Sequence, residues 1–231
     1  TVSTVGLSGG GTIPKPGEVS LAHGGVLFLD EVVHFSNAAI EVLRQPMEDK
    51  KVQIARAYGT FTYPADFMLV TAMNPCPCGY YPDRNRCACD ETKVRRYLSA
   101  ISGPILDRID ICVEVPRMEM KDLERKGEES SADMRKRIER ARYMQQERFQ
   151  GLKLSFNAQM GPEEIKEFCK LDDKERRFVE EAFNALKLSA RAYHKILKVA
   201  RTIADLEGSE RITELHLAGA IAYRSVDRKY W

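Results

Sequence analysis

The sequence lacks several features that would assign it at once to a large class of proteins. No apolar run approaches the roughly 20 residues that a membrane-spanning helix needs, and no signal peptide is recognisable. We therefore expect a soluble, cytoplasmic protein with no membrane partner. The sequence also lacks a large excess of charge of either sign, because it has 36 Lys and Arg residues and 34 Asp and Glu residues, for a net charge of +2. Any basic surface that binds nucleic acid must therefore be local.

A phosphate-binding loop of the form Gly-x-x-x-x-Gly-Lys-Ser/Thr is absent too. The stretch Ser8-Gly9-Gly10-Gly11-Thr12 resembles one superficially, but no Lys-Ser or Lys-Thr follows it. No predicted strand precedes it either. We interpret residues 1–20, which are rich in Gly, Pro and Ser, as a loop.

Residues 25–31, Gly-Val-Leu-Phe-Leu-Asp-Glu, are the most informative stretch. A continuous apolar run is typical of a strand buried on both faces of a parallel sheet. Asp30 and Glu31 then stand at the strand's carboxyl end, where open α/β sheets bind ligands. One carboxylate can hold Mg²⁺ and the next can orient a water against a phosphate. This is the Walker B pattern of an ATPase, although a buried strand ending in a helix cap is an alternative.

The Walker B pattern without a phosphate-binding loop predicts that the chain is a fragment. We expect it to begin after the loop that cradles the nucleotide. On this hypothesis the fragment alone neither binds ATP with full strength nor hydrolyses it.

Hydrophobic periodicity predicts an α/β part, residues 1–116, followed by an all-helical part, residues 117–231. In the first part we predict strands at 25–30, 67–73 and 111–115, helices at 37–48, 92–100 and 104–108, and a β-hairpin formed by 52–56 and 60–63. Pro46 is expected to kink or stop the first helix. In the second part a polar break at 127–133 precedes helices to about residue 150 and at 161–170, 172–187, 189–206 and 213–225.

Four of the six cysteines, Cys76, Cys78, Cys87 and Cys89, fall within fourteen residues. In a cytosolic protein such clustering favours a metal over disulfides. Zn²⁺ prefers four tetrahedral thiolates, usually supplied by two tight pairs. The spacing here is Cys-x-Cys rather than the commoner Cys-x-x-Cys, so free thiols or an oxidation-prone cluster are alternatives to a structural zinc site. We expect the other two, Cys112 and Cys169, in the core.

Asn74 ends the second predicted strand. If the two strands are parallel neighbours, its amide lies beside Asp30 and Glu31, where it could hydrogen-bond the attacking water or the γ-phosphate. The alternative is a turn Asn that precedes Pro75.

Two arginines could act on a nucleotide. Arg108 is either an arginine finger that reaches a neighbouring subunit or a surface ion pair with Asp107 or Asp110. Arg191 lies near a helix start, where a cation opposes the helix dipole unless a phosphate or a carboxylate partners it.

Two basic stretches could contact nucleic acid. One is the hairpin region with Lys50, Lys51 and Arg56, and the other runs from Arg84 to Arg96. Helix 135–148 is basic as well, but its Glu139 and Glu147 pair with cations at helical spacing, so we interpret it as solvated surface.

Several long motifs resemble the magnesium-chelatase-like AAA+ ATPases of bacteria, the ComM/YifB group. They are residues 10–31, 72–79 and 102–110, and residues 189–193 and 199–206 are similar to the helical lid of the group. The resemblance covers essentially the whole chain.

The resemblance implies an α/β fold, an AAA+ core of parallel sheet and helices lacking its N-terminal P-loop part, followed by the all-helical lid. It implies a homo-oligomeric ring, hexameric, with ATP and Mg²⁺ between subunits. At matching positions Asp30 and Glu31 are Walker B, Asn74 is sensor 1, Arg108 is the arginine finger and Arg191 is sensor 2.

The resemblance also implies a DNA motor. The hairpin at 52–63 is similar to the pre-sensor-1 hairpin that faces the pore in related ring helicases. Members of the group drive branch migration in recombination and natural transformation, so branched or single-stranded DNA is the expected partner.

The sequence departs from the group in three places. The upstream domain and the phosphate-binding loop are missing, and the hairpin tip, residues 57–59, is not strongly basic. Val32-Val33-His34-Phe35 also stands where the group has Leu-Pro-Glu-Phe.

Two other functions remain as alternatives. One is a magnesium chelatase motor subunit with a protein and tetrapyrrole client, in which the cysteine cluster is not expected. The other is a non-enzymatic, zinc-bearing interaction module, which predicts no ATPase activity and a silent Glu31→Gln change.

Overall fold

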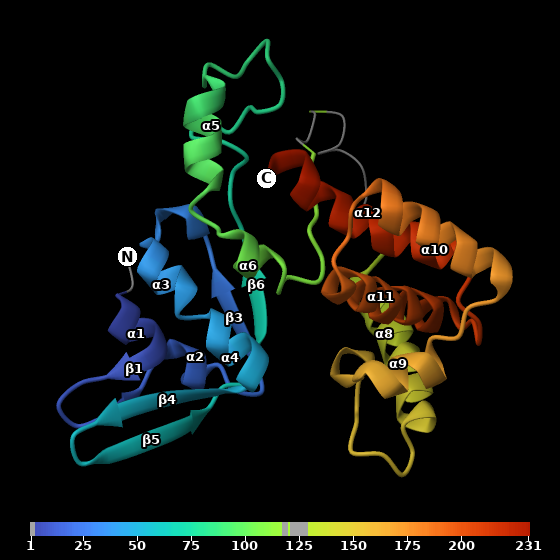
Figure 1. The fold of residues 1–231 in the computed structure, drawn as a ribbon, viewed down its shortest axis with the longest axis horizontal. Helices are drawn as coiled ribbons and strands as arrows, with labels where there is room; N and C mark the ends of the chain where they lie inside the picture. Colours follow the sequence, from blue (N-terminus) through green and yellow to red (C-terminus); the bar gives the residue numbers. More distant parts are fainter. Residues whose placement is uncertain (1–2, 117–119, 121–128) are drawn as a thin grey trace. The chain divides into compact units, whose positions relative to one another are not determined.

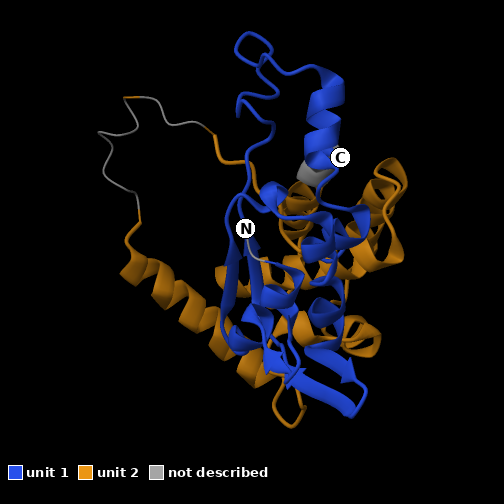
Figure 2. Ribbon diagram, turned by 90° about the vertical axis from the view of Figure 1, so that its left-hand side faces the viewer, with its two compact units in different colours: residues 1–109, 230–231 blue, residues 110–229 orange. Residues whose placement is uncertain are grey.

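The protein divides into two compact units in a computed structural model that describes residues 3–116, 120 and 129–231. The first unit comprises residues 1–109 with 230–231, and the second comprises residues 110–229 (Figures 1 and 2). The first is α/β and the second is helical, which confirms the predicted fold class. The predicted boundary at residue 116 stays a prediction, and residues 127–128 of the predicted polar break lie outside the described residues. None of the described helices is long and apolar enough to cross a membrane.

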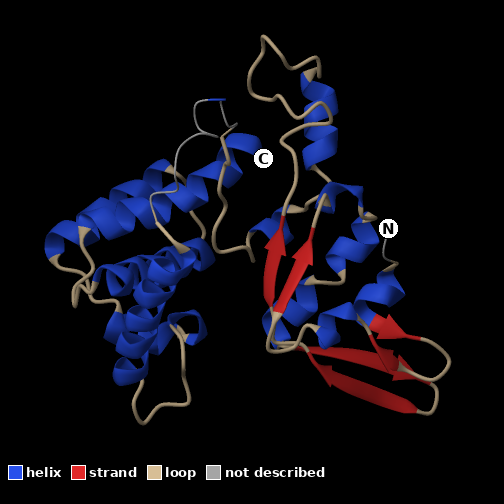
Figure 3. Cartoon of the chain, turned by 180° about the vertical axis from the view of Figure 1, so that it is seen from behind, coloured by secondary structure: helices blue, strands red, loops and turns tan. Residues whose placement is uncertain are grey.

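The α/β unit contains short helices and three two-stranded sheets (Figure 3). Its elements in chain order are α1 (Thr4–Ser8), β1 (Gly9–Gly10), β2 (Lys15–Pro16), α2 (Glu18–Leu21), β3 (Val26–Leu29), η1 (Val32–His34), α3 (Asn37–Glu41), α4 (Arg44–Asp49), β4 (Lys51–Arg56), β5 (Gly59–Pro64), β6 (Met68–Thr71), α5 (Glu91–Leu98) and α6 (Gly103–Leu106).

Strands β3 and β6 pair in parallel, with Val26 opposite Met68 and Leu29 opposite Thr71. Both strands lie where the sequence predicts them. The expectation that β3 is buried on both faces is wrong, because Val26 and Phe28 are 58% and 57% exposed whereas Leu27 and Leu29 are buried. The described sheet has two strands, and only one of its faces packs on the core.

Residues 3–20, the described part of the predicted loop 1–20, include two short helices and two short strands. Ser3 caps α1 by accepting a hydrogen bond from the backbone N–H of Gly6 at 3.0 Å, and Leu7 and Val19 are fully buried in the core. Gly17 allows the backbones to meet, since a Cβ there would lie 2.3 Å from the nitrogen of Gly9. Two well-spaced apolar residues thus anchor the segment despite its loop-like composition.

The predicted helix at 37–48 is two helices, α3 and α4. Ser36 caps α3, with its Oγ accepting from the N–H of Ala39 at 3.2 Å. The break at residues 42–43 follows from Pro46, which has no N–H to donate to the carbonyl four residues earlier.

The predicted hairpin is confirmed. Strands β4 and β5 are antiparallel, with Arg56 opposite Gly59 across the two-residue turn Ala57–Tyr58. Gly59 has a φ of 153°, a value that other residues rarely adopt.

The predicted strand at 111–115 does not form. Ile111, Val113 and Val115 are 50%, 63% and 83% exposed, and no described strand pairs with them. Strand-forming residues alone do not make a strand without a neighbour to share hydrogen bonds. Cys112 is half-buried and lies outside the core clusters, contrary to expectation, whereas Cys169 is in the core as predicted.

The helical unit contains the predicted helices and one short 3-10 helix, η2, that the sequence did not predict. They are α8 (Ser131–Arg148), η2 (Asn157–Gln159), α9 (Pro162–Phe168), α10 (Asp173–Ala185), α11 (Ala190–Glu207) and α12 (Glu214–Tyr230). Helix α11 supplies Ile196, Leu197 and Ala200 to the core of this unit. Ser189 caps its start, and Gly208 ends it with a φ of 74°.

Candidate functional site

The acidic pair follows β3 directly and is exposed. The side chain of Asp30 accepts a hydrogen bond from the backbone N–H of Glu31 at 2.9 Å. Glu31 has φ 48° and ψ 45°, in the left-handed region that residues other than glycine seldom adopt. Such a conformation costs on the order of 1–3 kcal/mol and is found mostly at functional sites. The turn therefore presents both carboxylates to solvent at the carboxyl end of the strand.

The parallel pairing brings Asn74 to the same edge. The N–H of Ala72 donates to the carbonyl of Leu29 at 3.0 Å, and the N–H of Val32 donates to the carbonyl of Ala72 at 3.2 Å. Asn74 comes two residues later and is exposed. The premise that the two strands are parallel neighbours is confirmed, and the catalytic roles of Asp30, Glu31 and Asn74 stay predictions.

Two aromatic side chains beside the acidic pair were not anticipated as site residues. The rings of His34 and Tyr97 meet edge to face, with centroids 6.4 Å apart and an interplanar angle of 77°. Burial raises the pKa of Tyr97, and the charges of Cys76 and Glu31 raise it further.

Arg108 is held within its own unit. Its Nη2 lies 2.7 Å from Oε2 of Glu48, its Nη1 donates to the carbonyl of Pro104 at 2.6 Å, and its side chain is 8% exposed. The sequence raised an ion pair of Arg108 as an alternative, and the structure shows one with Glu48. Asp110 pairs with Lys195 at 2.9 Å. The role of Arg108 as a finger stays a prediction, and it requires release from Glu48.

Arg191 is the second residue of α11, in the helical unit, and is exposed. The acidic pair and Asn74 belong to the other unit. The contact of Arg191 with a nucleotide therefore stays a prediction.

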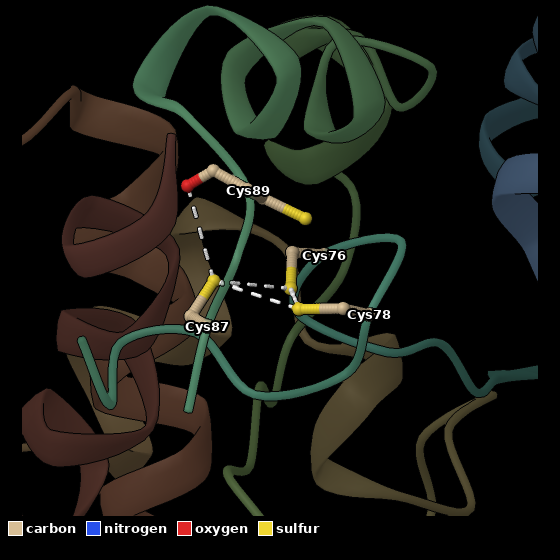
Figure 4. A group of neighbouring side chains, drawn as sticks. All are labelled: Cys76, Cys78, Cys87 and Cys89. Carbon is tan, nitrogen blue, oxygen red and sulfur yellow. Dashed lines mark hydrogen bonds between the residues drawn. The ribbon is translucent and has the colours of Figure 1, made fainter. Parts of the chain in front are cut away.

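The four clustered cysteines converge on one point (Figure 4). Their Sγ atoms all lie within 4.8 Å of one another, and all four thiols are free. The Sγ of Cys76 is 3.3 Å from that of Cys78 and 3.8 Å from that of Cys87, and the latter two are 3.6 Å apart. Tetrahedral Zn²⁺ with Zn–S bonds of about 2.3 Å would place its sulfurs about 3.8 Å apart. The donor set and its spacing therefore fit zinc.

The loop that carries the thiols has a small core of its own. Cys76 and Cys89 pack with Val94 and Leu98 of α5, and Tyr81 and Tyr97 lie against them. Asp90 caps α5 immediately after Cys89, with its Oδ1 accepting from the N–H of Lys93 at 2.7 Å.

The β4–β5 hairpin carries cations and exposed aromatic rings. No Asp or Glu occurs between Lys50 and Ala65. Lys50 pairs with Asp66 at 3.1 Å, Lys51 is exposed, and the Nε of Arg56 donates to the carbonyl of Gly11 at 3.0 Å. The binding roles of these three residues stay predictions.

The loop between β1 and β2 lies against this hairpin. The hydroxyl of Tyr58 donates to the carbonyl of Thr12, and that of Tyr63 donates to the carbonyl of Pro14 at 2.8 Å. Tyr58 is nevertheless 64% exposed, and its ring meets that of Phe61 at 5.9 Å.

Comparison with known families gives matches that together cover most of the chain. Residues 1–123 match the sequence model of the family "Magnesium chelatase, subunit ChlI", and residues 128–224 match "Magnesium chelatase, subunit ChlI C-terminal". The chain is similar to the competence protein ComM of Haemophilus influenzae, with 46% identity over 99% of the chain and 44% of the relative. It is 43% identical to the Escherichia coli protein YifB over the same shares. The chain therefore spans less than half the length of these relatives.

Proposed function

Because the chain belongs to the magnesium chelatase subunit ChlI family, we propose that it is the hydrolytic core and lid of a ComM-like AAA+ ATPase that moves DNA. The observation that carries the proposal is the edge at which Asp30, Glu31 and Asn74 follow two parallel strands. Two carboxylates and a neutral amide at such an edge are suited to the γ-phosphate of a nucleotide and its metal.

Each residue of this edge has a distinct task in the proposal. Asp30 would hold Mg²⁺, which when bound neutralises charge on the phosphates. Glu31 orients the attacking water and polarises it toward the γ-phosphate. Asn74 donates a hydrogen bond from its amide and so fixes the water or the phosphate.

The two arginines act across the ring that the family relationship suggests. We assign Arg108 to the nucleotide of a neighbouring subunit, where it offsets charge in the transition state. Such an arginine is worth about three to five orders of magnitude in rate. Arg191 contacts the nucleotide from the lid, and a hexameric homo-oligomer is the assembly expected.

The hairpin is the proposed DNA contact. Lys50, Lys51 and Arg56 supply positive charge with no acid between Lys50 and Ala65, and the exposed rings of Tyr58 and Phe61 offer faces on which bases stack. Cations with aromatic rings are typical of surfaces that bind single strands.

ATP hydrolysis by the full-length protein, with and without branched DNA, tests the proposal beside Glu31→Gln. We expect DNA to stimulate hydrolysis, and the substitution to abolish it while ATP still binds. Hydrolysis that ignores DNA but responds to a tetrapyrrole-bearing protein would favour the chelatase-type motor, whose name the family carries. No hydrolysis, with a silent Glu31→Gln change, would favour the non-enzymatic module.

The second part of the proposal is a structural zinc ion on Cys76, Cys78, Cys87 and Cys89. The four free thiols already approach the spacing of a tetrahedral site. Because all four positions would be filled by protein, the site is structural and not catalytic. Metal analysis of reduced, chelator-free protein should give one zinc per chain, and a value far below one would exclude the site.

A further inference from the structure

Asn74 lies between two anchored side chains. Met73 packs both against the core of the α/β unit and against the small core around the thiols. Cys76 comes two residues after Asn74 and is fully buried. The backbone of Asn74 is therefore held on both sides by side chains that belong to the cysteine cluster.

Helix α5 forms a second connection to the thiols. It starts at Glu91, directly after Cys89 and its capping residue Asp90. Val94 and Leu98 of this helix pack against Cys76 and Cys89. Outside its turns, the loop at residues 75–90 has no regular secondary structure. The arrangement of the four thiols therefore determines the position of α5.

Tyr97 carries this connection to the acidic pair. Its ring, on α5, meets the ring of His34 edge to face, with the centroids 6.4 Å apart. His34 ends the short helix η1, and its backbone N–H donates to the carbonyl of Glu31 at 2.9 Å. The same turn holds Glu31 in its left-handed conformation. A displacement of α5 would therefore reach the turn of Glu31 through one ring contact and one backbone hydrogen bond.

Resting on the ATPase function proposed above, we propose that Tyr97 and His34 are positioning residues that tie the four-thiol metal site to Glu31. The metal then supports the hydrolytic step and leaves nucleotide binding unchanged. Neither ring needs to touch the nucleotide. Their task is to keep the turn of Glu31 and the segment of Asn74 in register with each other.

The first experiment compares zinc-loaded, full-length Tyr97→Ala, Tyr97→Phe and Ser99→Ala proteins with the wild type. Three quantities are measured: zinc per chain, the Kd for a fluorescent ATP analogue, and kcat for ATP hydrolysis. We expect Tyr97→Ala to keep its zinc and its Kd and to lose roughly 10-fold to 100-fold in kcat, the scale of misplacing a catalytic group by an ångström or less. Tyr97→Phe keeps the ring, and Ser99 is an exposed residue directly after α5, so both variants should match the wild type.

Removing zinc provides the second comparison. A chelator should lower kcat in the wild type, but it should add little in Tyr97→Ala because the connection is already broken. Full additivity of the two losses, an unchanged kcat in Tyr97→Ala, or loss of zinc from that variant would each overturn the inference.

A readout independent of catalysis separates this inference from the ATPase proposal. Zinc removal should shift the ring resonance of His34, in protein with isotope-labelled histidines, in the wild type and not in Tyr97→Ala. If the wild type shows this shift but hydrolyses no ATP, the ATPase proposal fails and the connection stands. If the resonance of His34 is unmoved, or moves equally in both proteins, the connection is refuted whatever the activity.

Discussion

Arg148 and Asp205 form a two-point ion pair inside the helical unit, with Nη1 to Oδ2 at 2.8 Å and Nη2 to Oδ1 at 2.5 Å. The carboxylate of Asp205 is fully buried and also accepts from Arg201 Nε at 3.1 Å and Asn157 Nδ2 at 2.8 Å. One carboxylate thus joins α8, η2 and α11. A buried charge with this many partners is costly to lose, because removal leaves the cations without compensation.

Asp205→Asn should therefore destabilise the helical unit strongly. Arg148 and Arg201 would remain 13% and 3% exposed without their shared anion. Breaking a buried ion pair on one side costs roughly 3–5 kcal/mol in the free energy of unfolding. Urea unfolding followed by far-UV circular dichroism measures this loss.

Asp172→Asn is the matched control. Asp172 pairs with Arg211 at 3.4 Å, but the two side chains are 75% and 82% exposed. An exposed pair contributes about 0–1 kcal/mol. If both substitutions cost the same, the buried network does not stabilise the unit as described.

Arg108→Ala should lower the kcat of the full-length ATPase by about three orders of magnitude or more if the side chain acts as an arginine finger. The substitution also removes the ion pair with Glu48, so a fall in activity alone would be ambiguous. Glu48→Gln breaks the same pair at 2.7 Å and keeps the arginine. Steady-state hydrolysis by both variants separates the two effects.

The finger hypothesis predicts opposite outcomes for this pair of variants. Glu48→Gln should retain activity or raise it, because Arg108 is freed from its partner. Equal losses in the two variants would assign Arg108 a structural role as the partner of Glu48.

The sequence is sufficient to predict the features that depend on local pattern. The apolar run before Asp30, the parallel position of Asn74 and the helices of the second unit all follow from periodicity and capping. Features that depend on partners distant in the chain cannot be predicted from the sequence in this way. The pair of Arg108 with Glu48 spans sixty residues, and Ile111 to Val115 have strand-forming side chains but no neighbouring strand.

Isolated apolar residues and contacts between distant residues explain the other features that the sequence did not predict. Leu7 and Val19 are too far apart to form a pattern, yet both are fully buried and fold the segment predicted as loop. Likewise nothing local joins His34 to Tyr97, although their rings meet. Such contacts are set by tertiary packing, on which a window of sequence carries no information.

Cys76→Ser should remove zinc and lower the melting temperature. Zinc that binds the folded protein alone stabilises it by mass action, by about 4 kcal/mol when free zinc is 1,000 times its Kd. The expected result is a metal content well below one per chain and a lower melting temperature by calorimetry. A chelator should reproduce the effect in the wild type and add nothing in the variant.

Cys112→Ser is the control for the cysteine experiment. Cys112 is half-buried and lies outside the four-thiol group. It should keep its full zinc content and its response to chelator. Equal metal loss from both variants would mean that zinc binds by thiols elsewhere.

Lys51→Ala and Tyr58→Ala should weaken the binding of single-stranded DNA for different reasons. Lys51 is an exposed cation on a hairpin free of acids, so its loss should reduce the slope of log affinity against log salt by roughly 0.7. Tyr58 exposes 64% of its surface, and the loss of one stacked base costs about 1–3 kcal/mol with no change in the salt slope.

Two control variants accompany these substitutions. Tyr58→Phe should bind as the wild type does, since the ring remains. Lys153→Ala removes an exposed cation in the helical unit and should leave both the affinity and the salt slope unchanged. Fluorescence anisotropy over a series of salt concentrations measures both. A slope that falls equally for Lys51→Ala and Lys153→Ala would mean that the hairpin is not the DNA contact, because positive charge anywhere on the protein would then serve as well.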